Sequence, residues 1–212
     1  RGLLEPALMP LQRGDMRLPG NFTTRIGRDG RVALTRFDVT GGPGQISMPA
    51  QFDVPVPVQR VSLQGRVDAG SDRLAIDSAV AELGGSQLAA RVSVSGLVSG
   101  RTPKTGALVV AGHVSAGNIP VETLGRYWPK QVARGAREWV VENITGGVAE
   151  EGEVDFVLRF PGGGGTVAIE RLEGGFGGSE LTLHYLRPLP PIQNAAGQAT
   201  LTDKAFNVEF AG

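Results

Sequence analysis

The chain has 212 residues, enough to bury the core of one large β domain or two small ones. Its 21 basic and 21 acidic side chains balance, which argues against a nucleic-acid-binding protein, because such proteins need a basic surface to compensate phosphate charge. Cysteine is absent, which excludes disulfides, thiolate catalysis and cysteine-ligated metals.

The chain begins at Arg1 in the middle of a pattern, so we interpret it as a fragment of a longer protein. No window approaches the roughly 18 apolar residues that a membrane-spanning helix needs. A basic segment followed by an apolar one, as in a signal peptide, is also missing. We therefore expect any membrane anchor to lie outside this fragment.

Alternating apolar and polar residues predict strands along most of the chain. Asp29-Gly30, between Thr23–Ile26 and Val32–Leu34, predicts a hairpin. Further strands are predicted at residues 61–68, 74–76, 88–95, 154–160, 181–185 and 206–210. One apolar and one polar side on each strand is typical of an antiparallel sheet.

Glycine accounts for 32 residues, and its clusters are predicted to form the turns between strands. The main clusters are Gly41-Gly42-Pro43-Gly44, Gly84-Gly85, Gly174-Gly175 and Gly177-Gly178. A spacing of roughly 8–12 residues between turns indicates an all-β architecture. The pattern of residues 61–96 is partly echoed at 167–185, which suggests a sheet extended by a repeated unit.

A helical period replaces the alternation between Asn118 and Asn143. Asn118 is expected to cap a short first turn, and Pro129 to end it. A second helix is predicted from the three- and four-residue spacing of Val132, Ala136, Trp139, Val140 and Asn143. Gly146-Gly147 is expected to end this helix.

The aromatic residues of this helical segment are Tyr127, Trp128 and Trp139. We predict that they are structural anchors that pack the helices against the sheet, with Trp139 as the main contact. The alternative is an aromatic belt at a membrane interface.

No residues are spaced as a catalytic or metal site. His113 and His184 each lack a partner at the spacing that metal binding or general-base catalysis needs. Glu151, Glu153 and Asp155 are expected on the solvated side of a strand rather than as a glycosidase pair. The loop at 162–165 lacks the lysine and following helix of a phosphate loop. We therefore expect no enzymatic activity, cofactor or metal.

Three stretches resemble the AsmA-like bacterial envelope proteins of the YhdP type, which are related to TamB. They are residues 65–96, the helical stretch 126–147 with Arg126-Tyr127-Trp128-Pro129, and residues 174–191. Compared with the pattern of that family, the glycine-rich loop at 162–165 looks shortened and simplified. The resemblance implies a long, curved, antiparallel sheet that forms a repeating β-groove, with residues 1–117 and 146–212 in the groove and 118–145 as a helical insert.

The resemblance also implies a periplasmic segment of an inner-membrane-anchored protein of Gram-negative bacteria. Its partners would be phospholipid acyl chains, carried toward the outer membrane, and membranes reached through regions outside this fragment. The apolar sides of the strands would line the groove. The predicted lining residues are Val61, Leu63, Val67, Leu88, Val92, Val94, Phe156, Leu158, Leu181, Leu183, Phe206 and Val208.

A closed β-sandwich that serves as a scaffold of the cell envelope is the main alternative, and an enzyme domain is a third. Alternation does not separate a groove from a sandwich, because both need one apolar side on each strand. In a sandwich that side lies between two sheets, whereas in a groove it lines an open trough.

Overall fold

The computed structural model describes residues 17–47, 49, 51–68, 70–96, 108–130, 132–161 and 167–211. The fold is mainly β, with 65% strand and 10% helix, and its long antiparallel sheet is not closed into a barrel. A short helical segment interrupts the sheet at mid-chain. The predicted fold class is therefore confirmed. The glycine loop at 162–165 lies outside the described residues.

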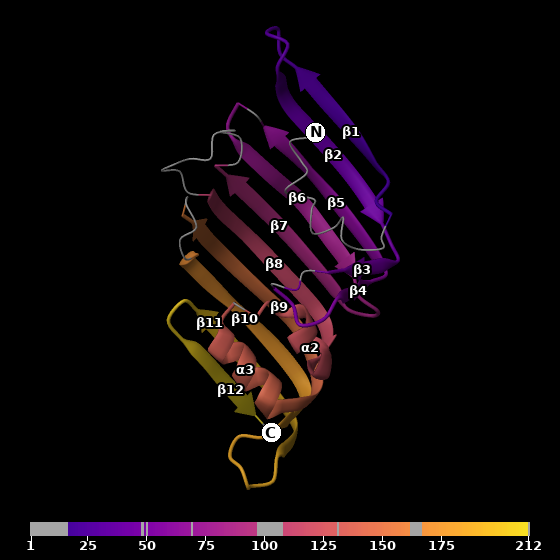
Figure 1. Cartoon of the computed structure of the whole chain (residues 1–212). Coiled ribbons are helices and arrows are strands. Elements are labelled where there is room, and N and C mark those ends of the chain that lie inside the picture. The colour runs from indigo at the N-terminus through magenta and orange to yellow at the C-terminus, as the bar shows by residue number, and fades with distance from the viewer. Residues whose placement is uncertain are drawn as a thin grey trace.

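Figure 1 shows one large sheet that runs from β1 at one edge to β12 at the other. Its ten strands are β1 (Gly20–Ile26), β2 (Val32–Gly41), β5 (Arg60–Asp68), β6 (Arg73–Glu82), β7 (Gln87–Ser95), β8 (Leu108–Pro120), β9 (Ile144–Phe160), β10 (Ala168–Leu183), β11 (Ile192–Thr202) and β12 (Phe206–Ala211). A separate small sheet pairs β3 (Gly44–Ile46) with β4 (Val56–Val58). Helices α2 (Val121–Tyr127) and α3 (Arg134–Asn143) connect β8 to β9.

The register gives the sheet one apolar and one polar face. Directly paired residues lie on the same side of a sheet, so a row of partners can be followed across it. The row Phe37, Gly65, Ile76, Val92, Gly112, Phe156 and Leu172 crosses from β2 to β10 without a polar residue. The adjacent row on the opposite side is Arg66, Ala75, Ser93, Ala111, Val157 and Arg171. We call these sides the apolar face and the polar face.

Several glycines lie inside strands, beneath phenylalanine rings on the apolar face. Gly65 is paired with Phe37, and a Cβ atom built on Gly65 would lie 2.5 Å from the ring. Gly112 is paired with Phe156 in the same way, at 2.7 Å. A side chain at either glycine would displace the ring. Glycine at these positions lets a phenylalanine ring pack closely on the neighbouring strand, and it does not mark a turn.

The predicted turns at Gly174-Gly175 and Gly177-Gly178 are wrong, because these glycines also lie inside a strand. Both pairs lie within the single strand β10, so residues 167–185 do not repeat a small unit. A Cβ atom on Gly174 would lie 2.4 Å from the carbonyl oxygen of Glu153 on β9. The backbones of the two strands approach too closely there for a side chain. The strand ends at Leu183, so Tyr185 lies beyond it.

The helix ends also differ from the prediction. Asn118 lies in β8 with a left-handed φ of 55° and does not cap α2, whose first residue follows Pro120. Gly146-Gly147 lies within β9, which begins directly after α3. Instead, the Asn143 side-chain amide donates a hydrogen bond to the Trp139 carbonyl oxygen at 2.8 Å. This bond satisfies a carbonyl group at the helix end without a glycine.

The apolar face is covered at its two sides by different elements. Helices α2 and α3 pack over β9–β12, where Val140, Leu181, Leu183 and Ala195 form a buried cluster. On the other side, Val56 and Val58 of the small sheet pack on Val61 of β5. The described residues therefore form one large sheet with local covers, and not two facing sheets of a sandwich.

Candidate functional site

The predicted lining residues share the apolar face but differ in exposure. Val61, Val67, Leu181 and Leu183 are buried, with Leu183 only 2% exposed. The half-buried members are Leu63, Leu88, Val92, Val94, Phe156, Leu158, Phe206 and Val208. Leu181 and Leu183 pack with Val140 of α3 and belong to a core beneath the helices. The prediction that both line an open surface is therefore wrong, because α3 covers them.

The uncovered part of the apolar face crosses β7, β8 and β9. Its residues are Val92, Val110, Val114, Leu158 and Phe160, which we call the open strip. All are half-buried, and none belongs to any of the buried clusters among the described residues. Val110 pairs with Leu158, which places their side chains on the same side of β8 and β9. The open strip is a continuous apolar surface across neighbouring strands.

Sequence reasoning missed Val110, Val114 and Phe160 as lining residues. The first two lie on β8, where Val109 and Ala111 place apolar residues on the polar face as well. The alternation of β8 is therefore weak. Pairing with β9, whose alternation is clear, identifies the side on which each β8 residue lies.

Two packed clusters flank the open strip. Phe37, Val39, Val67 and Leu74 form the first, toward β2. Ala136 of α3 forms the second with Leu172 and Leu201 of the sheet. The strip thus lies between the packed cluster on the β2 side and the helices.

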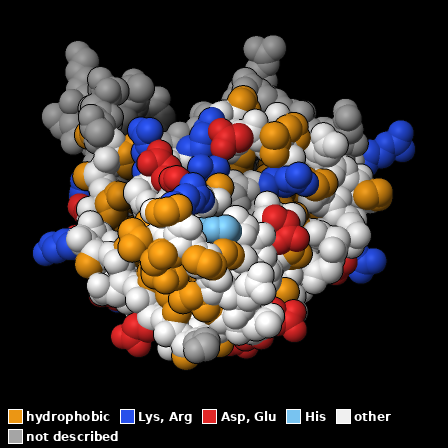
Figure 2. All heavy atoms as spheres, turned by 90° about the horizontal axis from the view of Figure 1, so that it is seen from below, with side chains coloured by type: hydrophobic (Ala, Val, Ile, Leu, Met, Phe, Trp, Pro, Cys, Tyr) orange, Lys and Arg blue, Asp and Glu red, His pale blue; other side chains and the backbone are white. Residues whose placement is uncertain are grey.

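An apolar crevice continues from the sheet beneath the helices. It lies between α2, α3 and strands β9–β12, and its interior of about 20 Å³ has room for about one water molecule. Leu124 and Trp139 line it from the helices, and Phe176, Val208 and Phe210 from the sheet. Figure 2, a view from below Figure 1, shows hydrophobic side chains gathered in a patch with charged side chains around it.

The predicted aromatic anchors contact three different places. Trp139 lies against Phe206 and Phe210 of β12, with ring centroids 6.1 and 6.5 Å apart. Trp128 meets Phe176 edge-on at 6.1 Å, and its indole N–H donates to the Val132 carbonyl oxygen at 2.8 Å. Tyr127 packs instead against the cluster around the small sheet. The aromatic residues thus hold the helical segment on both the large and the small sheet.

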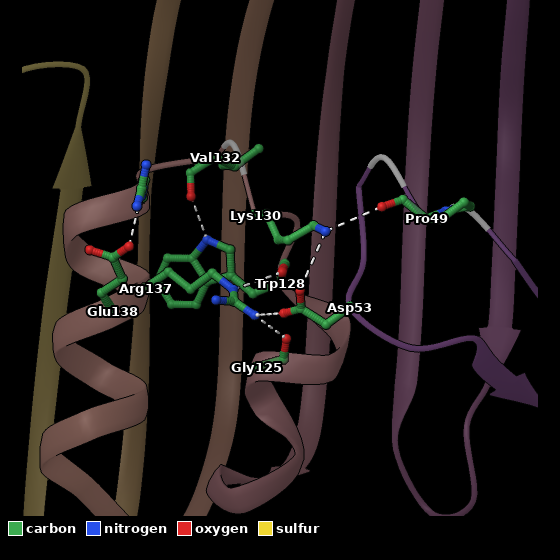
Figure 3. A network of polar contacts seen from close by, with 9 residues as sticks. Pro49, Asp53, Gly125, Trp128, Lys130, Val132, Arg137 and Glu138 are labelled. Atoms are coloured by element: carbon green, nitrogen blue, oxygen red, sulfur yellow. Dashed lines mark hydrogen bonds and ion pairs between the residues drawn. The ribbon is translucent and has the colours of Figure 1, made fainter.

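A polar network joins the helices to the segment between β3 and β4 (Figure 3). The Arg137 guanidinium, on α3, donates to the Asp53 carboxylate and to the Gly125 carbonyl oxygen, each at 2.9 Å. It also donates to the Trp128 carbonyl oxygen at 3.2 Å. Lys130 pairs with the same carboxylate at 3.3 Å. We call this group the Arg137 clasp, because it links the two covers of the apolar face.

We expect Arg137→Met to weaken the docking of the helices and lower the free energy of unfolding by about 2 kcal/mol. The Arg137 side chain is only 15% exposed, and hydrogen bonds to charged groups contribute about 1.5–3 kcal/mol. Methionine keeps much of the apolar stem. Denaturant unfolding measures the change. Arg134→Met, at a side chain 79% exposed, is the control and should change stability by less than about 0.5 kcal/mol. Equal effects would contradict the clasp.

The polar face carries ordinary ion pairs of a solvated surface. Glu151, Glu153 and Asp155 are exposed on it, as predicted. His113 has a partner that its sequence neighbours did not predict, since its Nδ1 lies 3.2 Å from the Asp155 carboxylate on the adjacent strand. A hydrogen bond from Arg171 to the Glu173 carboxylate raises the pKa of that guanidinium above its usual value. The Arg171 guanidinium therefore stays charged at neutral pH.

Within the described ranges, no group of three or more His, Cys, Asp or Glu side chains is placed to hold a metal ion. A search of the same residues finds no helix with the length and apolar character to span a bilayer.

No protein-family model matches this chain, and no curated protein or solved structure is significantly similar to it.

Proposed function

We propose that this chain is a segment of a lipid-transfer groove, in which phospholipid acyl chains lie along the apolar face of the sheet. The observation that carries the proposal is the open strip, a continuous apolar surface on β7–β9 that no described element covers. A contiguous, half-buried apolar surface without a packing partner among the described residues is typical of a ligand or membrane contact.

The chemistry of the open strip suits an acyl chain. The strip crosses three neighbouring strands, which at a spacing of about 4.8 Å span roughly 10 Å across the sheet, so an acyl chain would lie along the strands rather than across all ten of them. Each methylene moved from water to the strip gains about 0.8 kcal/mol. Since the strip has no polar side chain, no position along it holds a chain much more strongly than the next.

The wider setting of the proposal comes from resemblance. Residues 65–96, 126–147 and 174–191 are similar to AsmA-like envelope proteins of the YhdP type. We infer from this similarity a periplasmic segment of an inner-membrane-anchored protein, which takes part in phospholipid transfer between the two membranes and in outer-membrane integrity. The full-length gene tests the inference, because it should encode an anchor helix and further β-repeats.

Photo-crosslinking tests the groove itself. A photoreactive residue at Val92 should capture phospholipid when the chain is produced in the periplasm of a Gram-negative bacterium. The control is Ala89, three residues before Val92 on β7, whose side chain lies on the polar face. It should capture little or no phospholipid. Mass spectrometry of the adducts measures the difference.

Equal capture at Val92 and Ala89 would refute a face-specific lipid path. Capture of protein instead of phospholipid at Val92 would favour the scaffold alternative, in which another protein covers the strip.

A further inference from the structure

The polar face contains a hollow with a floor of small side chains. Ala75, Ser93 and Ala111 are paired in register across β6, β7 and β8. Arg66 continues this row on β5, and Arg171 closes it on β10. The hollow measures about 970 Å³, counting space open to solvent. The short side chains of Ala75, Ser93 and Ala111 between the long arginines leave a depression on the polar face.

The hollow has an excess of positive charge, although the chain as a whole is neutral. Four arginines line it, together with the carboxylates of Asp77 and Asp155. Arg66 is paired with Asp77 at 2.5 and 2.6 Å, and Arg171 with Glu173 at 2.5 Å. Asp155 lies beside His113.

The remaining arginines, Arg73 and Arg91, also line the hollow. Neither forms an ion pair or side-chain hydrogen bond with another residue that the structure describes. Each guanidinium therefore keeps all of its N–H donors available for a ligand.

These two arginines lie on opposite sides of the paired residues Ala75 and Ser93. Arg73 precedes Ala75 by two residues on β6, and Arg91 precedes Ser93 by two residues on the antiparallel strand β7. At about 3.4 Å per residue, their Cα atoms lie on the order of 14 Å apart along the strands. Long side chains on both sides can lean over Ala75 and reach one small anion. The Ser93 hydroxyl lies between them, with a long 3.4 Å contact to the Ala111 carbonyl oxygen.

We propose that Arg73, Arg91 and Ser93 form a binding site for a phosphate group on the polar face. One guanidinium satisfies both oxygens of a carboxylate, whereas two guanidiniums and a hydroxyl on three sides match the tetrahedral oxygens of phosphate. The proposal does not depend on the lipid groove. The site and the open strip lie on opposite faces, so a lipid held in the groove cannot present its headgroup here through the sheet.

Titration with inorganic phosphate tests the site. We expect saturable changes in the NMR signals of the Arg73 and Arg91 Nε–H groups. In the R73Q/R91Q variant, phosphate affinity should fall by roughly tenfold or more, since hydrogen bonds to charged groups are worth that ratio each. Ser93→Asp, which places a negative charge between the two arginines, should abolish binding while both arginines remain. Circular dichroism checks that these variants fold.

Arg60→Gln is the matched control. Arg60 is exposed on the polar face of β5 but does not line the hollow. The variant removes one positive charge, as R73Q or R91Q does alone, and should bind phosphate as the unchanged chain does. A loss in Arg60→Gln equal to that in R73Q or R91Q alone would show only general attraction of anions and overturn the proposal. Unsaturable shifts, or binding that survives in R73Q/R91Q, would also overturn it.

Vesicles identify the source of the phosphate. Binding to phosphatidylglycerol vesicles that is lost in R73Q/R91Q would support the site and assign it to lipid headgroups at a membrane surface. Binding of inorganic phosphate without binding to these vesicles would support the site and assign it to a soluble phosphate compound.

Discussion

Leu183→Asp should be one of the most destabilising single substitutions in this chain, with a loss of at least about 4 kcal/mol in the free energy of unfolding. Leu183 is 2% exposed and packs with Val140 of α3 and Leu181 of β10. A carboxylate there loses its hydration without gaining a partner, and the packing of the leucine is lost as well. Denaturant unfolding followed by circular dichroism measures the effect.

Val92→Asp is the matched substitution on the open strip, and we expect it to fold. Val92 lies on the same face of the sheet but is only half-buried, outside the packed clusters of the described residues. Its new carboxylate stays in contact with water, so the loss of stability should be below about 1.5 kcal/mol. In the full-length protein, the same charge should impair outer-membrane integrity, because it interrupts the proposed acyl path.

The comparison of these two variants separates an open strip from a buried one. If Leu183→Asp and Val92→Asp destabilised the protein equally and severely, Val92 would be covered by another part of the protein. The open strip would then be refuted. A folded Val92→Asp variant that supports normal membrane integrity would leave the architecture intact but contradict the proposed lipid path.

Trp139→Ala should lower the free energy of unfolding by about 3 kcal/mol. The indole bridges α3 and the edge strand β12 through its contacts with Phe206 and Phe210. Aromatic pairs contribute about 0.5–1.5 kcal/mol beyond the area they bury. The loss also removes a wall of the apolar crevice. Thermal or denaturant unfolding checks the expected change.

Glu138→Ala provides the control for Trp139. Glu138 precedes Trp139 on α3 and is exposed, and its side chain forms a helical ion pair with Arg134. Such a pair is worth about 0.3–0.5 kcal/mol. A Trp139→Ala variant no less stable than Glu138→Ala would mean that α3 is held by Val140 and the Arg137 clasp rather than by the aromatic contacts.

Much of the sheet follows from the sequence, because alternation is a local property. Residues 61–68, 88–95 and 206–210 each lie within an observed strand, and Asp29-Gly30 joins β1 and β2 as predicted. The helical period between Asn118 and Asn143 likewise contains both α2 and α3. In these segments, the side chains that must avoid water recur at the period of the structure they form.

Glycine was misread where its role depends on another strand. Gly174 has no local feature that distinguishes it from a turn glycine. Its role is set by the neighbouring Glu153 and Val154 on β9, which leave no room for a Cβ atom. These contacts join residues on different strands, so they exist only once the sheet has its register.

The candidate site likewise has features that the sequence predicts and features that depend on the tertiary structure. The sequence alone determined that Val92 and Leu183 belong to apolar strand sides, since alternation states which residues share a side. Only the tertiary structure decided that Leu183 lies beneath α3 while Val92 stays half-buried outside the packed clusters of the described residues. Exposure depends on which distant element packs over a strand, and here that placement is set by contacts such as those of Trp139 and Arg137, which period and propensity do not encode.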